Sequence, residues 1–156
     1  MMNKHLKLAL CILSPLLIGG ISGYASASSI NIWYMGINKP FFNPPNYLFG
    51  PVWTMLYILM GISFYRILQS QDSDIKTKAV MIFCVQMFLF FCWSFLFFKF
   101  QLLGISFVEI ILMWISIATM IYTFSKIDKT AAYLQIPYLL WVSFASVLNG
   151  AIWYLN

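Results

Sequence analysis

The sequence predicts an all-α integral membrane protein, a bundle of five transmembrane helices. Of its 156 residues, 62% are hydrophobic and 8% are charged. A soluble domain carries about 25% charged residues, which it needs to cover its surface. Nine basic and four acidic side chains cannot cover a water-facing shell, so the lipid bilayer must be the solvent. The apolar runs are long and do not alternate with a period of two, which favours helices over a barrel.

Five apolar stretches reach the length of about 20 residues that a helix needs to cross the hydrocarbon. We place these spans at Leu6–Ala27, Tyr47–Gln69, Lys78–Phe100, Leu102–Phe124 and Ala131–Tyr154. The connector 28–46 is the longest and contains three prolines. The spans and their short connectors account for the chain as one domain, 1–156.

The first stretch has a second interpretation, as a signal peptide. Two early lysines, an apolar run and the Ala-Ser-Ala at 25–27 resemble such a peptide with its cleavage motif. However, the run exceeds the usual apolar region of about 7–15 residues. Gly19 and Gly23 also have the spacing that favours close helix packing. We therefore expect a retained span, and the two glycines leave open packing within the bundle or in a homodimer.

The basic residues divide unequally between the two ends of the spans. Lys39 and Lys99 fall at one end. The other end has Lys4, Lys7, Arg66, Lys76, Lys78, Lys126 and Lys129. The positive-inside rule then predicts a cytoplasmic N-terminus in a bacterial plasma membrane, with the first loop and the C-terminus outside. No basic stripe interleaves with aromatic residues, so the net charge of +5 does not predict a nucleic-acid partner.

Conventional catalytic motifs are absent from the sequence. Its one histidine, His5, precedes the first span, so a histidine triad or zinc site cannot form within the bundle. Cys11, Cys84 and Cys92 lie in apolar runs without a CxxC motif, and we interpret them as small hydrophobic residues. We expect no metal and no cofactor.

Glu109 is the only acid within the interior of a predicted span. An ionisable group at membrane depth is a functional candidate, for example as the proton-coupling carboxylate of a small transporter. The plainer interpretation is a residue near the helix start that is hydrogen-bonded to its neighbours and is neutral or close to the interface. Because Glu109 follows the preceding turn by only a few residues, the sequence favours the plainer interpretation.

Aromatic residues and prolines gather around the first connector. In order, they occur as Trp33-Tyr34, Lys39-Pro40, Pro44-Pro45 and Gly50-Pro51-Val52-Trp53. Prolines fix φ and stiffen a loop, so we expect an ordered cap over the mouth of the bundle. Taken alone, Trp33 and Tyr34 fit an interfacial aromatic belt equally well.

The third and last stretches add polar and aromatic residues to this pattern. Pro137 should bend the last helix. Gln86 and Asn149 are uncharged polar residues that prefer the bundle interior. Six tryptophans exceed what lipid anchoring requires, so we expect some to line an internal pocket. Flat aromatic ligands stack on such rings for about 0.5–1.5 kcal/mol per pair.

These residues together resemble the TspO/MBR family over nearly the whole chain. Besides the motifs above, the resemblance rests on Gln86, Trp93, Phe97-Phe98, Pro137-Tyr138, Trp141, Phe144-Ala145, Leu148-Asn149 and Trp153. It implies a five-helix bundle, usually dimeric. It also implies a cavity under the first loop that binds porphyrins, sterols and synthetic isoquinoline or benzodiazepine ligands.

The resemblance implies particular ligand-binding residues. These are Tyr34, Lys39, Pro40, Pro44, Pro45, Trp53, Gln86, Phe90, Trp93, Trp141, Ala145 and Asn149. Phe90 departs from the family, because many members carry an asparagine there, and one polar ligand contact is lost. The last stretch lacks the tyrosine and arginine of the sterol-recognition pattern of animal members. Tight sterol binding is therefore not implied, and the chain is closer to bacterial members.

The leading hypothesis is a membrane protein that binds protoporphyrin-type porphyrins. Without a histidine in the bundle, haem would lack an imidazole ligand, so a metal-free porphyrin is the more natural ligand or substrate. Lys39 would pair with a propionate. The resemblance further implies light-dependent degradation of the porphyrin, with Trp53, Trp141 and Tyr34 as redox or positioning partners.

Two other functions stay open. A transporter or sensor would handle porphyrins, sterols or other flat hydrophobic ligands without catalysis, although the sequence shows no inverted repeat. A purely structural protein would leave the internal tryptophans and the stiff loop unexplained.

Overall fold

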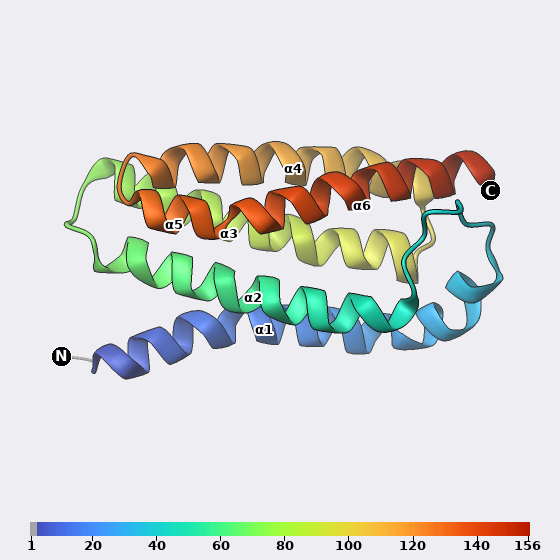
Figure 1. Cartoon of the computed structure of the whole chain (residues 1–156), viewed down its shortest axis with the longest axis horizontal. Helices are drawn as coiled ribbons and strands as arrows, with labels where there is room; N and C mark the ends of the chain where they lie inside the picture. The colour runs from blue at the N-terminus through green and yellow to red at the C-terminus, as the bar shows by residue number, and fades with distance from the viewer. Residues whose placement is uncertain (1–2) are drawn as a thin grey trace.

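The structure is a computed structural model that describes residues 3–156 (Figure 1). In chain order its helices are α1 (Lys4–Ser29), η1 (Ile30–Tyr34), α2 (Asn46–Gln69), α3 (Asp74–Ser94), η2 (Phe95–Lys99), α4 (Leu103–Ser125), α5 (Lys129–Leu134) and α6 (Ile136–Leu155). The labels η1 and η2 mark short π-helical segments that continue α1 and α3. No strand occurs within residues 3–156.

Five helical stretches are long and apolar enough to cross a membrane. They are Lys4–Tyr34, Asn46–Gln69, Asp74–Lys99, Leu103–Ser125 and Lys129–Leu155. These stretches differ from the predicted spans mainly at their ends. The all-α bundle of five transmembrane helices that the sequence predicts is thereby confirmed.

The five stretches run along one long axis as a single bundle (Figure 1). α1 packs against α2, and α4 packs against both α3 and α6. The start of α1 and the α2–α3 and α4–α5 connectors lie at one end, whereas the C-terminus and the loop before α2 lie at the other. The larger group of basic residues belongs to the first end, and Lys39 and Lys99 belong to the second. The orientation of these ends across the membrane stays a prediction.

The first helix is longer than the sequence predicts. The predicted span ends at Ala27, but helical backbone continues through η1 to Gly36, so the loop shrinks to residues 37–45. Residues 28–35 contain neither glycine nor proline, so no helix-breaking residue occurs before Gly36. Pro40 disfavours helical backbone at the residue before it. As a consequence, Tyr34 lies on the first helix and not in the loop.

Two prolines alter the helices locally. Pro15 has no N–H, so the carbonyl of Cys11 loses its usual partner within α1. The hydroxyl of Ser14 donates to that carbonyl at 3.1 Å instead. Pro137 lies in the first turn of α6, and the helix breaks just before it, at Gln135. The expected bend at Pro137 takes the form of this break between α5 and α6.

The side chain of Asp128 caps the start of α5. The carboxylate of Asp128 accepts hydrogen bonds from the amides of Thr130 and Ala131 and pairs with Arg66, at 2.8 Å, from the last turn of α2. Burial by itself would raise the pKa of Asp128, but the bonds from Arg66 and the two amides outweigh it and lower that pKa. These contacts fasten the end of α2 to the α4–α5 connector.

Glycines allow α1 and α2 to pack closely. At Gly61 of α2, a Cβ atom would collide with the backbone of Cys11 and Ile12 in α1. At Gly19 of α1, it would collide with the ring of Tyr57 in α2. The contact at Gly61 is made by backbone, which cannot move aside as a flexible side chain can. Only glycine at this position lets the two helices come so near.

We predict that Gly61→Ala destabilises the protein by about 1–3 kcal/mol, the usual cost of overpacking. The added methyl group must push α1 away from α2. Thermal denaturation in detergent measures the effect. Gly36→Ala is the matched control, because a Cβ atom there meets nothing within 4 Å. Equal melting temperatures for the two variants would contradict the close contact.

Candidate ligand-binding cavity

A cavity of about 420 Å³ lies in the half of the bundle next to the 37–45 loop. Its wall is built by the second half of α1 with η1, the first half of α2, the end of α3 with η2, and α6. No residue of α4 or α5 lines it. The cavity is mostly apolar, and no lysine, arginine, histidine, aspartate or glutamate is among its lining residues.

Seven of the predicted ligand-binding residues line this cavity. They are Tyr34, Trp53, Phe90, Trp93, Trp141, Ala145 and Asn149. They come from four separate transmembrane stretches, so the tertiary fold gathers them from both halves of the chain. The three candidate catalytic residues, which are Trp53, Trp141 and Tyr34, are among them.

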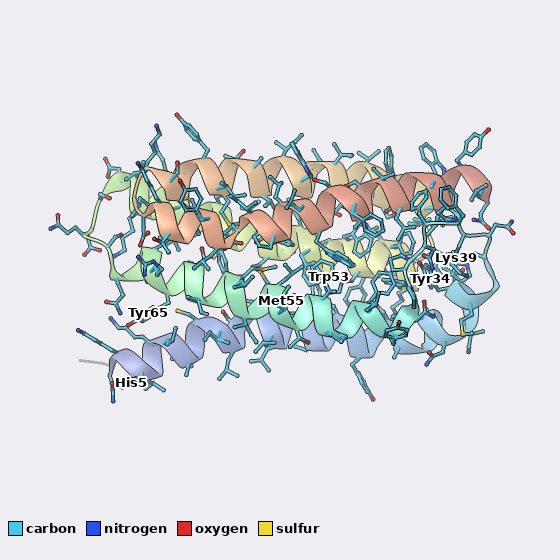
Figure 2. All side chains as sticks on the ribbon, viewed as in Figure 1. His5, Tyr34, Lys39, Trp53, Met55 and Tyr65 are labelled. Atoms are coloured by element: carbon cyan, nitrogen blue, oxygen red, sulfur yellow. The ribbon has the colours of Figure 1, made fainter. Side chains whose placement is uncertain are left out.

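Trp53 is the centre of an aromatic cluster in the wall. Its ring stacks on Tyr57, with centroids 5.6 Å apart and an angle of 23° between the planes. It also packs against Phe90 at 4.9 Å and meets Trp141 edge to face at 6.4 Å and 88°. Figure 2 shows Trp53 closer to the middle of the bundle than Tyr34 and Lys39, which lie at the loop end. Aromatic neighbours on three helices therefore hold this indole ring in one orientation.

Trp93 is fixed by a hydrogen bond between helices. Its indole N–H donates to the side-chain oxygen of Asn149 in α6 at 3.0 Å. The amide nitrogen of Asn149 in turn donates to the carbonyl of Leu103, at 3.2 Å, in the first turn of α4. The ring also stacks on Phe97 at 5.3 Å and 24°. Asn149 thus joins α3, α4 and α6 at the cavity.

The two π-helical segments meet at the loop end of the cavity. Tyr34 lies at the end of η1, and its ring is 6.1 Å from Phe97 and 5.7 Å from Phe98 in η2. A π-helical segment adds a residue to a helical turn and changes which side chains face inward. Sequence periodicity carries no clear sign of this change. The predicted span ends at Ala27, so Tyr34 falls in the predicted connector and not on the helix.

Polar contacts hold the 37–45 loop in place. The hydroxyl of Tyr34 donates to the side-chain oxygen of Asn43 at 2.7 Å. The backbone amide of Asn38 donates to the side chain of Asn156 at 3.0 Å, and Asn156 donates back to the Asn38 carbonyl at 2.9 Å. Phe42 packs edge to face on Phe144 of α6. The loop is therefore joined both to η1 and to the end of α6.

Five predicted ligand-binding residues do not line the cavity. The ammonium group of Lys39 donates to the carbonyls of Tyr34, Met35 and Ile37 at 2.6–3.3 Å. Lys39 therefore caps the end of the first helix, beside Tyr34 in Figure 2, and does not line the cavity. Its pairing with a propionate stays a prediction. The three loop prolines, Pro40, Pro44 and Pro45, are also absent from the wall.

Gln86, the fifth of these residues, lies deeper in the bundle. It is fully buried, and its amide nitrogen donates to the hydroxyl of Tyr138. The Tyr138 hydroxyl lies 3.7 Å from the sulfur of Met113 in α4. Gln86 thus links α3 to α6 behind the cavity and does not line it.

α1 contributes a wall of the cavity that is not among the predicted ligand-binding residues. Gly19, Gly20, Ser22, Gly23 and Ser26 all line the cavity. Small residues at intervals of three and four were the available signal, since that spacing places them on one helix face. At Gly20 and Gly23 a Cβ atom would meet nothing within 4 Å, as at Gly50 in α2. All three glycines are exposed, so the cavity is open to the outside of the bundle beside them.

Glu109 does not belong to this site. It lies on α4, is 8% exposed, and lines no part of the cavity. Neither carboxylate oxygen has a hydrogen-bond partner among the described residues. The plainer interpretation is therefore wrong about hydrogen bonds to neighbours, and its neutral or interfacial carboxyl group stays a prediction.

Fold and site together define a class of protein. It is a membrane bundle of five helices with an aromatic cavity under an ordered loop. The chain belongs to the TspO/MBR family, whose model matches residues 11–155. It is 44% identical to a tryptophan-rich protein TspO of Archaeoglobus fulgidus, over 97% of both chains. It is 39% identical to the protein of that name from Chlorobaculum tepidum, over 99% of both. The human translocator protein is 32% identical over 78% of this chain and 73% of its own.

The open space beside Gly23 predicts a selective loss of binding. A leucine at this position meets no neighbouring atom at Cβ, so Gly23→Leu should fold normally while its side chain fills part of the cavity. We expect its affinity for protoporphyrin to fall about tenfold or more, the cost of about two or three displaced contacts. A Soret titration in detergent measures this.

The matched control for this variant is Gly36→Leu, which also adds a leucine in open space but away from the cavity. A folded Gly23→Leu protein that binds as tightly as the control would contradict the assignment of the cavity.

Proposed function

We propose that this integral membrane protein binds metal-free porphyrins of the protoporphyrin type in the cavity between α1, α2, α3 and α6. The observation that carries the proposal is the convergence of three indole rings, from Trp53, Trp93 and Trp141, on one apolar cavity. Aromatic faces attract flat aromatic ligands by stacking. The volume of about 420 Å³ falls within the usual range of small-molecule sites.

The chemistry of the wall favours a porphyrin without iron. Within residues 3–156, no histidine, methionine or cysteine, the usual axial ligands of haem, lines the cavity. The tyrosine hydroxyls of Tyr34 and Tyr57 are the remaining candidates there, and Tyr34 already donates to Asn43. His5 lies at the opposite end of the bundle (Figure 2). Binding therefore depends on stacking and apolar contact more than on coordination.

We propose the same membrane placement as the basic residues predict, with the N-terminus in the cytoplasm and the cavity toward the outer side of a bacterial plasma membrane. A homodimer is also proposed. Tyr57 covers Gly19 within the bundle, and Gly23 lines the cavity. These two contacts favour another helix face for the interface between the two copies.

Transport or sensing of porphyrins is the second candidate function. The open side of the cavity beside Gly20, Gly23 and Gly50 favours it, since a flat ligand can leave the wall there without a helix moving. Relatives are named translocator protein and tryptophan-rich sensory protein. Uptake of a fluorescent porphyrin into liposomes that contain the protein distinguishes transport from binding alone.

Substituting the central tryptophans should weaken porphyrin binding. Trp53→Phe and Trp141→Phe keep an apolar ring but lose stacking area, so we expect each to lower the affinity for protoporphyrin about two- to tenfold. Soret titration is the measurement. Trp153→Phe is the control, because Trp153 packs against Phe107 outside the cavity and is half exposed. Affinities equal to the control in both variants would remove the proposed site.

We propose further that light degrades the bound porphyrin, with Trp141 as a redox or positioning partner. The indole N–H of Trp141 is buried and has no hydrogen-bond partner among the described residues, so a ligand group is free to bind it. Illumination should bleach the Soret band of the bound porphyrin faster in the wild type than in fully loaded Trp141→Phe. Equal bleaching rates would show that Trp141 has no share in the reaction.

A further inference from the structure

Two serine hydroxyls on the α1 wall of the cavity have no partner. Ser22 and Ser26 are each 2% exposed, and both line the cavity. Neither hydroxyl makes a hydrogen bond to any described residue. A buried polar group left unpaired costs free energy comparable to a lost hydrogen bond, so such groups require an explanation.

Other serines in the bundle show what these two could have done. A serine inside a helix ordinarily donates to the carbonyl of the preceding turn. The hydroxyl of Ser146 donates to Val142 at 2.7 Å, and that of Ser143 donates to Leu139 at 2.8 Å. Ser22 and Ser26 have the same option within α1 and do not use it. Both hydroxyl oxygens are covered within the wall and keep their hydrogen-bonding capacity, and rotation about the Cα–Cβ bond would turn them toward a molecule in the cavity.

The geometry of α1 limits what that molecule offers. Residues four apart lie on one helix face, about 6 Å apart along the axis. Two hydroxyls at this separation can bracket one oxygen atom or one carboxyl group. Each hydroxyl can donate as well as accept, so the pair suits a carbonyl and also the O–H of a neutral acid.

The electrostatics of the cavity argue against an anionic group at this place. No basic side chain within residues 3–156 lines the cavity. The ammonium group of Lys39 lies 5.0 Å from the ring centroid of Tyr34 but donates to three backbone carbonyls. A carboxylate buried at membrane depth without a cation is costly, and two hydroxyls do not compensate it. A neutral oxygen-bearing group avoids that cost and still satisfies both serines.

We propose that Ser22 and Ser26 bind an uncharged carbonyl-type group of the ligand, such as an ester, an amide or a carboxylic acid in its neutral form. This assignment rests on the proposed function, because it names the polar end of a ligand whose flat part lies against the tryptophans. It makes α1 the helix that selects among flat ligands by their substituents.

Two porphyrins with similar rings and different substituents test the assignment. Protoporphyrin IX dimethyl ester offers ester carbonyls, whereas octaethylporphyrin has only alkyl groups. In the double variant Ser22→Ala/Ser26→Ala, we expect the affinity for the dimethyl ester to fall about ten- to thirtyfold, as for two lost hydrogen bonds. The affinity for octaethylporphyrin should stay within about twofold, because it makes no such bonds.

Ser146→Ala is the matched control, since it removes a buried helical hydroxyl that lies outside the cavity. Thermal denaturation without ligand shows that the double variant is folded. We expect its melting temperature to equal or exceed that of the wild type, because two unpaired hydroxyls are removed and alanine favours helix.

Three outcomes would overturn the assignment, and they differ from one another. An unchanged affinity for the dimethyl ester shows that the serines make no bond to it. An equal loss for both porphyrins shows that they act through the shape of the cavity. If the wild type binds neither porphyrin, the proposed function fails and this assignment fails with it.

Discussion

Hydrocarbon offers no hydrogen-bond partner to a polar group, and this constraint decides how the helices of the bundle are rotated. Polar side chains pair across helices instead. Asn149 accepts from Trp93, and Gln86 donates to Tyr138. Trp114 of α4 donates to Ser143 of α6 at 2.7 Å. Each pair fixes the rotation of one helix against another, and the aromatic wall of the cavity follows from those rotations.

Among residues 3–156, the buried side-chain polar atoms that have no hydrogen-bond partner fall into two groups. The first group is buried away from the cavity and consists of Glu109, Gln135 and one oxygen of Gln86. The second group lines the cavity and consists of the hydroxyls of Ser22 and Ser26 and the indole N–H of Trp141. The second group comes from α1 and α6, which form different parts of the cavity wall. Such an arrangement is what a ligand with polar substituents on a flat body requires.

The sequence predicted the bundle well, because long apolar runs have few other solutions in lipid. The number of tryptophans predicted that some of them line an internal pocket, and the resemblance to the TspO/MBR family indicated which ones. It could not predict the role of Lys39, because the carbonyls that bind its ammonium group become unpaired only when the first helix ends at that point. The hydroxyls of Ser22 and Ser26 could not be assigned either, since a helical serine ordinarily bonds to its own backbone.

α4 packs against α3 and α6 but contributes nothing to the cavity wall. One face of α4 carries exposed apolar residues, which are Ile105, Val108, Leu112 and Ile115. The surface that meets the surrounding lipid on this side and the surface that meets a ligand are therefore made by different helices. Evolution can adjust the first to a membrane of another composition or thickness while ligand recognition is preserved.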